Sequence, residues 1–219
     1  MLNPDFQKTI STLIPKLKTF YSNDFSGHDW YHTFRVWKMS EYIAVKENAD
    51  VSLCCISALL HDVSDWKKDE DEGHQLIVSW LLECQIQTEI IQKVCEIISE
   101  TSFKGAKVDD KATSLESKIV MDADRLDAIG AIGIARAFAF GGSRNNPIHI
   151  PDDELLMASS FEEYKSRTSP AISHFYEKLL LLKDRMNTET AKKIAINRHQ
   201  ILIDFLKAFH TEWDFKDLE

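Results

Sequence analysis

Apolar residues recur every three or four positions along most of the chain, which is the spacing of one face of an α-helix. The stretch 51–62 is apolar on nearly all sides, which is typical of a central helix. The pattern predicts helices over residues 10–20, 28–44, 51–62, 74–83, 87–100, 115–140, 172–186 and 191–213.

Polar residues and glycines mark the ends of these helices. Ser26 and Asp29 have the spacing of a capping box, and Asp50 and Thr188 are predicted N-caps. Gly141-Gly142 is expected to end the long helix over 115–140. The stretches 65–73, 104–113 and 141–153 are predicted loops.

Two glycines lie inside the long helical pattern. Gly130 and Gly133 would each cost about 1 kcal/mol relative to Ala in a helix interior. We therefore expect them to permit close packing between helices.

The composition supports an all-α class. Only 7 Gly and 5 Pro occur among 219 residues, far fewer than a turn-rich sandwich or barrel needs. No repeat and no long linker divides the chain, so the sequence predicts one all-α domain over residues 1–219.

The net charge of −9 has the wrong sign for a general nucleic-acid or anionic-membrane surface. An anionic substrate would need a local cationic or metal site. The N-terminus lacks the pattern of a signal peptide, and no apolar run is long enough to span a membrane, so we expect a cytoplasmic protein. Buried thiols in a reducing compartment are expected at Cys54, Cys55, Cys84 and Cys95.

Polar side chains interrupt two of the apolar patterns. His61 and Asp62 end the most hydrophobic helix, and Asp124 and Asp127 fall on an apolar stripe of the long helix. A buried, unpaired carboxylate costs several kcal/mol, so these acids need a partner. No matching buried Lys occurs in these segments, which indicates a metal cation.

Three further donors share one face of the predicted helix over 28–44, because His28, His32 and Arg35 are four and three residues apart. Imidazole and carboxylate ligands suit Mn, Fe, Co, Ni, Zn or Mg with open water positions. A closed structural zinc site would instead use Cys. The pattern therefore favours a catalytic ion.

These residues resemble the HD-domain superfamily of metal-dependent phosphohydrolases, whose mark is a His, a later His-Asp pair and a distant Asp. The resemblance implies an all-α HD fold with the metal site between core helices. It includes the segments 27–36, 58–62, 121–136, Gly141-Gly142 and Lys178-Leu-Leu, and it extends over nearly the whole chain. It implies the metal ligands His32, His61, Asp62 and Asp124, with Asp122 and Asp127 as candidates for supporting positions.

The resemblance also suggests how the chain is organised: a metal-binding core over about 26–140, with C-terminal helices within 152–215 packed on it. Only His74 lies between the His-Asp pair and Asp124, whereas dinuclear relatives insert further histidines. The resemblance therefore implies one divalent ion, which would be Mn, Mg, Co, Ni or Fe.

The remaining roles follow from phosphoryl chemistry. A divalent ion polarises a phosphate oxygen and lowers the pKa of a bound water. Related phosphatases carry an acid three residues after the pair, so Asp65 is the candidate catalytic residue; alternatively, it begins a solvated acidic loop. Candidate substrate-binding residues are Arg35, Lys67, His28 and Lys104. Arg125 is a further, weaker candidate. Lys104 and Arg125 could equally be surface charges, and His28 could equally be a residue that only starts a helix.

The bacterial subgroup that the chain resembles most includes nucleotide pyrophosphohydrolases. We therefore expect hydrolysis of a nucleoside or deoxynucleoside triphosphate to the monophosphate and pyrophosphate. The substrate would be a small phosphorylated molecule, with no nucleic acid or membrane partner and a possible homodimer. The alternatives are a nucleoside monophosphatase, a non-catalytic nucleotide or metal sensor, and an iron oxygenase, which the scarcity of histidines disfavours.

Overall fold

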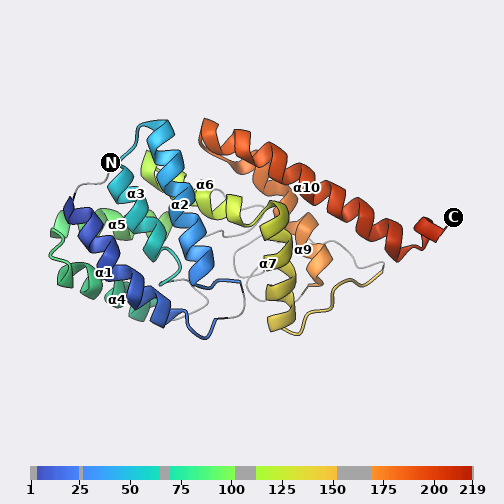
Figure 1. Cartoon of the computed structure of the whole chain (residues 1–219), viewed down its shortest axis with the longest axis horizontal. Coiled ribbons are helices and arrows are strands. Elements are labelled where there is room, and N and C mark those ends of the chain that lie inside the picture. Colours follow the sequence, from blue (N-terminus) through green and yellow to red (C-terminus); the bar gives the residue numbers. More distant parts are fainter. Residues whose placement is uncertain (1–3, 25–26, 65–69, 102–111, 152–168, 219) are drawn as a thin grey trace.

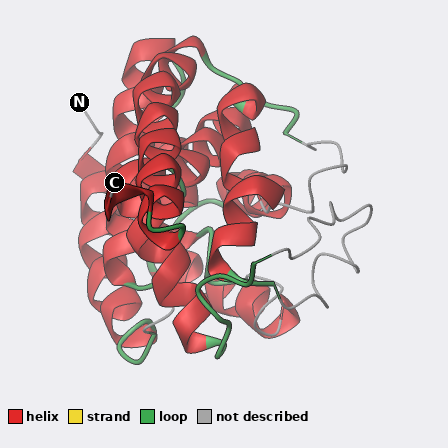
Figure 2. Ribbon diagram, turned by 90° about the vertical axis from the view of Figure 1, so that its right-hand side faces the viewer, coloured by secondary structure: helices red, strands yellow, loops and turns green. Residues whose placement is uncertain are grey.

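Helices make up all the regular secondary structure in the described part of the chain, as the hydrophobic pattern predicts (Figure 2). The computed structural model describes residues 4–24, 27–64, 70–101, 112–151 and 169–218. The elements are α1 (Pro4–Phe20), α2 (Trp30–Glu47), α3 (Val51–Leu60), α4 (Glu70–Glu83), α5 (Thr88–Thr101), α6 (Leu115–Asp127), α7 (Gly130–Ser143), α9 (Ala171–Glu177), the 3₁₀-helix η1 (Leu179–Arg185), α10 (Glu189–Trp213) and the 3₁₀-helix η2 (Lys216–Leu218).

The core forms around α3, which packs against α2, α5 and α6. Seven successive residues of α3 are buried, from Cys54 to Leu60, so the helix has almost no solvent-facing side. Its N-cap is Asp50, as predicted, whose carboxylate accepts a hydrogen bond from the Leu53 amide at 3.0 Å. The end of this central helix therefore lies deep in the protein.

The C-terminal helices pack on α6 and α7. Helix α10 contacts α7, α6, η1 and α2, and its C-terminal half extends away from α2 and α3 (Figure 1). Thr188 caps it, as predicted, by accepting a hydrogen bond from the Ala191 amide at 3.3 Å. Among the described elements, none is both long enough and apolar enough to cross a membrane.

The prediction of one helix over 115–140 is wrong, because the chain breaks between α6 and α7. Gly130 has a φ of +77°, a left-handed conformation that side chains with a Cβ rarely adopt, and Ile129 before it is extended. The break lies three residues after Asp127. The break changes the direction of the chain, so that α7 packs against α6 instead of continuing it.

Gly133 allows close packing between helices, as expected, at this break. A Cβ at this position would overlap the backbone carbonyl of Ala128, the residue that caps the C-terminus of α6. The first turn of α7 can therefore lie directly against the end of α6 only because position 133 has no side chain.

Other predicted boundaries shift by a few residues. Helix α4 begins at Glu70, so residues 70–73 are helical rather than part of a loop, and Gly73 lies against the backbone of Val63 and Ser64. Gly141-Gly142 lies within α7, which ends at Ser143. The stretch 172–186 is divided between α9 and η1.

The two glycines of α7 allow a matched test of the break. Gly133→Ala should destabilise the protein by about 1–3 kcal/mol, because its Cβ has no room. Gly142→Ala should be neutral or slightly stabilising, since nothing lies within 4 Å of its Cβ. Urea unfolding of both variants measures the difference, and equal stabilities would contradict this account of Gly133.

Candidate metal centre

His32 lies in the first turn of α2, where the N-cap fixes its position. The Asp29 carboxylate accepts a hydrogen bond from the His32 amide at 2.8 Å. The helix therefore begins at Trp30, slightly later than the predicted start near His28. Ser26, the other half of the predicted capping box, lies outside the described residues. The His32 side chain is fully buried.

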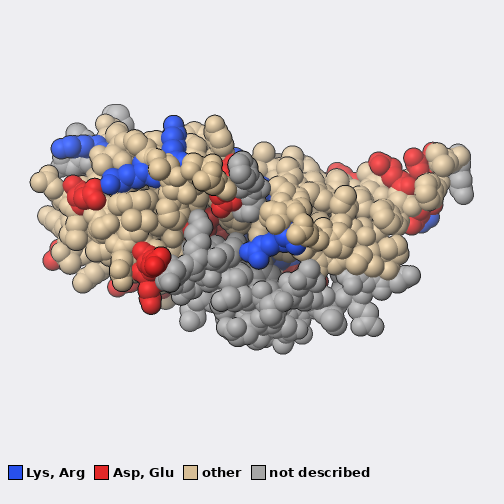
Figure 3. Space-filling view, turned by 90° about the horizontal axis from the view of Figure 1, so that it is seen from below, with Lys and Arg blue, Asp and Glu red and all other residues tan. Residues whose placement is uncertain are grey.

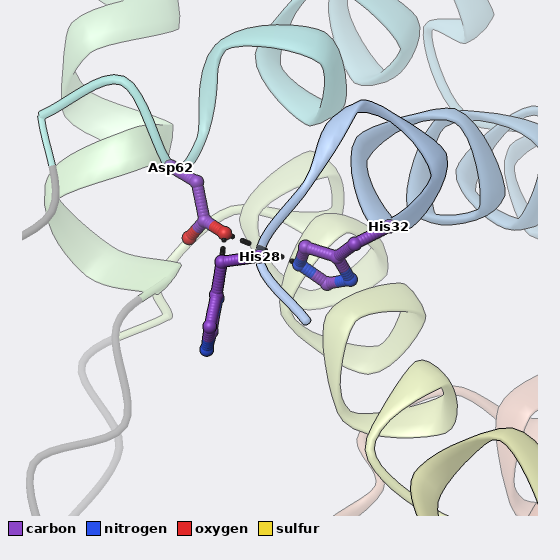
Figure 4. A group of neighbouring side chains, drawn as sticks. All are labelled: His28, His32 and Asp62. Atoms are coloured by element: carbon purple, nitrogen blue, oxygen red, sulfur yellow. Dashed lines mark hydrogen bonds and ion pairs between the residues drawn. The ribbon is translucent and has the colours of Figure 1, made fainter. Parts of the chain in front are cut away.

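His61 and Asp62 follow directly after α3, which ends at Leu60 rather than continuing to Asp62 as predicted. The His61 Nδ1–H donates to the carbonyl oxygen of Ala58 at 2.8 Å. The Asp62 carboxylate points toward His28 and His32 (Figure 4). The end of the central helix thus brings an imidazole and a carboxylate to the start of α2.

Four predicted ligands converge at this point. The Nε2 atom of His32 lies 3.2 Å from Nε2 of His61, 3.2 Å from Oδ2 of Asp62 and 3.5 Å from Oδ1 of Asp124. The His61 Nε2 atom lies 3.4 Å from Oδ1 of Asp62 and 3.8 Å from Oδ1 of Asp124. These donors from α2, the end of α3 and α6 form two overlapping groups that share His32: His32, His61 and Asp124 form one, and His28, His32 and Asp62 form the other.

The hydrogen bonds of the two rings show what this position requires. A carbonyl oxygen only accepts, so His61 carries its proton on Nδ1. His32 likewise donates from Nδ1 to Oδ2 of Asp127 at 2.7 Å. In their neutral forms, both rings then direct an Nε2 lone pair into the same buried space. Two facing lone pairs beside two carboxylates repel one another, and either a proton on one ring or a metal ion between the donors removes this repulsion.

The spacing of the donors fits a metal ion. With ligand bonds of about 2.0–2.2 Å, neighbouring ligand atoms lie about 2.8–3.6 Å apart, depending on the coordination geometry. Four of the five distances given above fall in this range, and the fifth is 3.8 Å. Each of the two overlapping groups of donors therefore has a spacing that could hold a metal ion.

Asp127 supports the centre from outside the donor set. Its carboxylate accepts from His32 Nδ1, and from Nε and Nη2 of Arg35 at 2.6 and 2.9 Å. Burial alone would raise the pKa of Asp127, but the hydrogen bonds from His32 and Arg35 hold it well below its ordinary value. The ionised carboxylate fixes the tautomer of the His32 ring and its orientation.

Asp122 points away from the centre. It accepts from the Asn187 and Thr188 amides and from both of their side chains, at 2.7–3.1 Å. Burial raises the pKa of Asp122, although these hydrogen bonds oppose the shift. Its role is to join α6 to the N-terminus of α10, which leaves Asp124 and Asp127 as the acids of α6 that face the centre.

The donor carboxylates are ionised despite their surroundings. Burial would raise the pKa of Asp62, but the charges of His61 and His28 lower it well below its ordinary value. For Asp124, burial is likewise outweighed by the charges of His61 and His32. Burial lowers the pKa of His32, but the carboxylates of Asp127 and Asp62 raise it overall.

The predicted substrate-binding residues have different outcomes. His28 donates from Nδ1 to Oδ2 of Asp62 at 3.0 Å, and Arg35 is held by Asp127, with its side chain one-third exposed. Both are therefore beside the donor cluster, and their contact with substrate stays a prediction. Asp65, Lys67 and Lys104 lie outside the described residues.

Two further arginines differ from what the sequence suggested. Arg125 is buried and donates to the Arg185 carbonyl, which places it in packing rather than at the surface. Arg136, which was not among the predicted site residues, forms an ion pair with Asp127, with its Nη1 atom 3.1 Å from Oδ2. Only the break at Gly130 brings it there, so no signal in the helical pattern could have identified it.

The part of the chain that carries these donors matches a known protein family. The HD domain model matches residues 29–129, a range that includes all four donors. The YpgQ protein of Bacillus subtilis is 36% identical over 194 residues, which are 87% of each chain.

Solved structures of similar chains cover nearly the whole length. A Lactobacillus plantarum protein is 33% identical with a TM-score of 0.88, and covers 98% of this chain and 99% of its own. An HD-superfamily hydrolase from Bacillus thuringiensis is 38% identical with a TM-score of 0.73, at 95% and 98% coverage. B. subtilis YpgQ in complex with ADP is 34% identical with a TM-score of 0.71, at 91% and 97% coverage.

Metal titration tests the donor set. His61→Ala and Asp124→Ala should abolish Mn²⁺ binding, and Asp127→Ala should weaken it about 10- to 100-fold by removing the acceptor of the His32 ring. Isothermal titration calorimetry of metal-depleted protein measures these affinities, and circular dichroism checks the fold. The exposed His74→Ala is the matched control and should bind as the wild type does. Retained binding in Asp124→Ala would move the ligand role to Asp127.

Proposed function

This chain belongs to the HD domain family, and we propose that it is a metal-dependent nucleotide pyrophosphohydrolase, which cleaves a nucleoside or deoxynucleoside triphosphate to the monophosphate and pyrophosphate. The chain is a hydrolase of the HD superfamily. The observation that carries the proposal is the convergence of the His32 and His61 Nε2 atoms with the carboxylates of Asp62 and Asp124.

The charge around the centre favours an anionic substrate. A divalent ion would balance the two donor carboxylates, while Asp127 faces both Arg35 and Arg136. The ion and the two arginines would therefore concentrate positive charge at the loaded site, with Asp29 also near Arg35, inside a chain of net charge −9. Acidic and basic side chains are intermixed at the left of the face in Figure 3, so attraction of an anion depends on this local excess.

The residues at this site would have distinct roles in the hydrolysis. His32, His61, Asp62 and Asp124 would hold the ion, which supplies Lewis acidity toward the phosphate and the attacking water. His28 would keep the Asp62 carboxylate in place through its hydrogen bond. Asp65 would accept the proton of the attacking water, and Arg35 and Lys67 would stabilise charge on the phosphoryl oxygens.

Support for a nucleotide comes from the complex of B. subtilis YpgQ with ADP, since that protein is 34% identical to this chain over 91% of its length. A nucleoside monophosphatase or a nucleotide sensor would also fit a nucleotide-binding HD domain. Two arginines lie beside the metal centre, and their charges suit a substrate with several phosphoryl groups better than a monophosphate. We therefore favour the pyrophosphohydrolase.

Metal reconstitution tests the proposed reaction. Metal-depleted protein should be inactive, and Mn²⁺, Mg²⁺, Co²⁺ or Ni²⁺ should restore pyrophosphate release from at least one nucleoside triphosphate. A panel of nucleoside mono- and triphosphates, with phosphate and pyrophosphate measured separately, gives the answer. Release of phosphate alone would contradict a pyrophosphohydrolase, and no turnover with any metal would contradict an enzyme.

The role of Asp65 has its own test. Asp65→Asn should retain Mn²⁺ binding but lower kcat about a hundredfold or more, because the proton acceptor is lost while the ligands remain. Asp69→Asn removes the same charge from the same acidic stretch and should leave kcat unchanged. Equal kcat values for the two variants would show that Asp65 belongs to a solvated loop.

A further inference from the structure

Arg136 is held rigidly beside the candidate metal centre. Its Nε–H donates to the carbonyl oxygen of Gly27 at 2.8 Å, and its Nη1 group contacts Asp127 at 3.1 Å. The side chain is 13% exposed and packs directly on Gly27, whose φ is +86°. Arg136 thus joins α7 to the segment that precedes α2.

Arg35 and Arg136 share a single carboxylate. Arg35 uses its Nε and Nη2 groups on Asp127, and Arg136 uses Nε and Nη1 on Gly27 and Asp127. The Nη1 group of Arg35 and the Nη2 group of Arg136 therefore make no hydrogen bond to another residue in the described part of the chain. Two guanidinium groups therefore face the Asp127 carboxylate, and Asp29 is a further carboxylate near enough to act on Arg35.

Arg136 also lies close to the metal donors. Gly27, which accepts its hydrogen bond, precedes His28, which donates to Asp62. The Asp127 oxygen that Arg136 Nη1 contacts at 3.1 Å also accepts the hydrogen bond from the His32 ring at 2.7 Å. An anion at the metal centre would therefore experience the Arg136 charge.

We propose that Arg136, together with Arg35, binds a second phosphoryl group of the substrate, next to the one held at the metal centre. The site then selects molecules with two adjacent phosphoryl groups over monophosphates. This inference rests on the proposed function, since it names the substrate feature that the same site recognises. The planar guanidinium can donate two parallel hydrogen bonds to phosphate oxygens, and its fixed position lowers the entropy cost of doing so.

The competing explanation is that Arg136 only neutralises Asp127. In that case its removal would disturb the His32 ring and weaken every ligand of the centre together. The proposal instead predicts that loss of Arg136 weakens the binding of pyrophosphate much more than that of phosphate or Mn²⁺. All three affinities can be measured without turnover.

Calorimetric binding of inorganic pyrophosphate and of inorganic phosphate, each with Mn²⁺ present, tests the proposal. Wild-type protein should bind pyrophosphate at least tenfold more tightly than phosphate. Arg136→Gln should lose about 10- to 100-fold in pyrophosphate affinity, and less than threefold in phosphate and Mn²⁺ affinity. Arg136→Lys keeps the charge but loses the planar guanidinium group, so its pyrophosphate affinity should lie between those of the wild type and Arg136→Gln. It replaces the Gln variant if that variant does not fold. Lys207→Gln, the same charge loss on the exposed side of α10, should match the wild type.

Equal losses for pyrophosphate, phosphate and Mn²⁺ would overturn the proposal in favour of a structural role. So would unchanged pyrophosphate binding in Arg136→Gln, or a wild-type protein that does not prefer pyrophosphate. These results are separate from failure of the proposed function. A wild-type enzyme that releases pyrophosphate while Arg136→Gln binds it normally contradicts only the role of Arg136.

Discussion

Two imidazole nitrogens that face each other across 3.2 Å are the constraint on which the site depends. The facing pair arises because each ring is tied at its other nitrogen, His32 to the Asp127 carboxylate and His61 to the Ala58 carbonyl. Both ties fix the proton on Nδ1 and leave a lone pair on Nε2. Two neutral rings in this arrangement would both direct a lone pair toward the same space, which suits a cation between the donors.

The residues of this arrangement come from the first turn of α2, the end of α3 and the last turn of α6. The Asp29 cap sets where α2 begins and places His32 in its first turn, while the buried α3 ends where His61 and Asp62 are needed. Asp122 connects α6 to the start of α10 through a set of hydrogen bonds on the side opposite the centre. The C-terminal helices therefore help to hold the helix that presents Asp124 and Asp127.

Helical spacing explains which parts of the site the sequence could predict. At about 100° per residue, Asp124 and Asp127 lie about 60° apart on α6, whereas Asp122 lies about 160° from Asp124. A continuous helix would place Arg136 about 180° from Asp127 and about 13 Å along the axis. The left-handed Gly130 changes both values, and the two side chains meet at 3.1 Å. The donors could be chosen from the helical faces and the family resemblance, but a contact made by a backbone turn could not.

The most direct test of the central claim is the position of a bound ion. Crystals of the protein grown with Mn²⁺ should give one strong anomalous peak within about 2.0–2.3 Å of His32 Nε2, His61 Nε2 and carboxylate oxygens of Asp62 and Asp124. The His32 Nδ1 contact to Asp127 should remain in place. A peak coordinated by a different set of residues, or the absence of any peak between the two Nε2 atoms, would contradict the account.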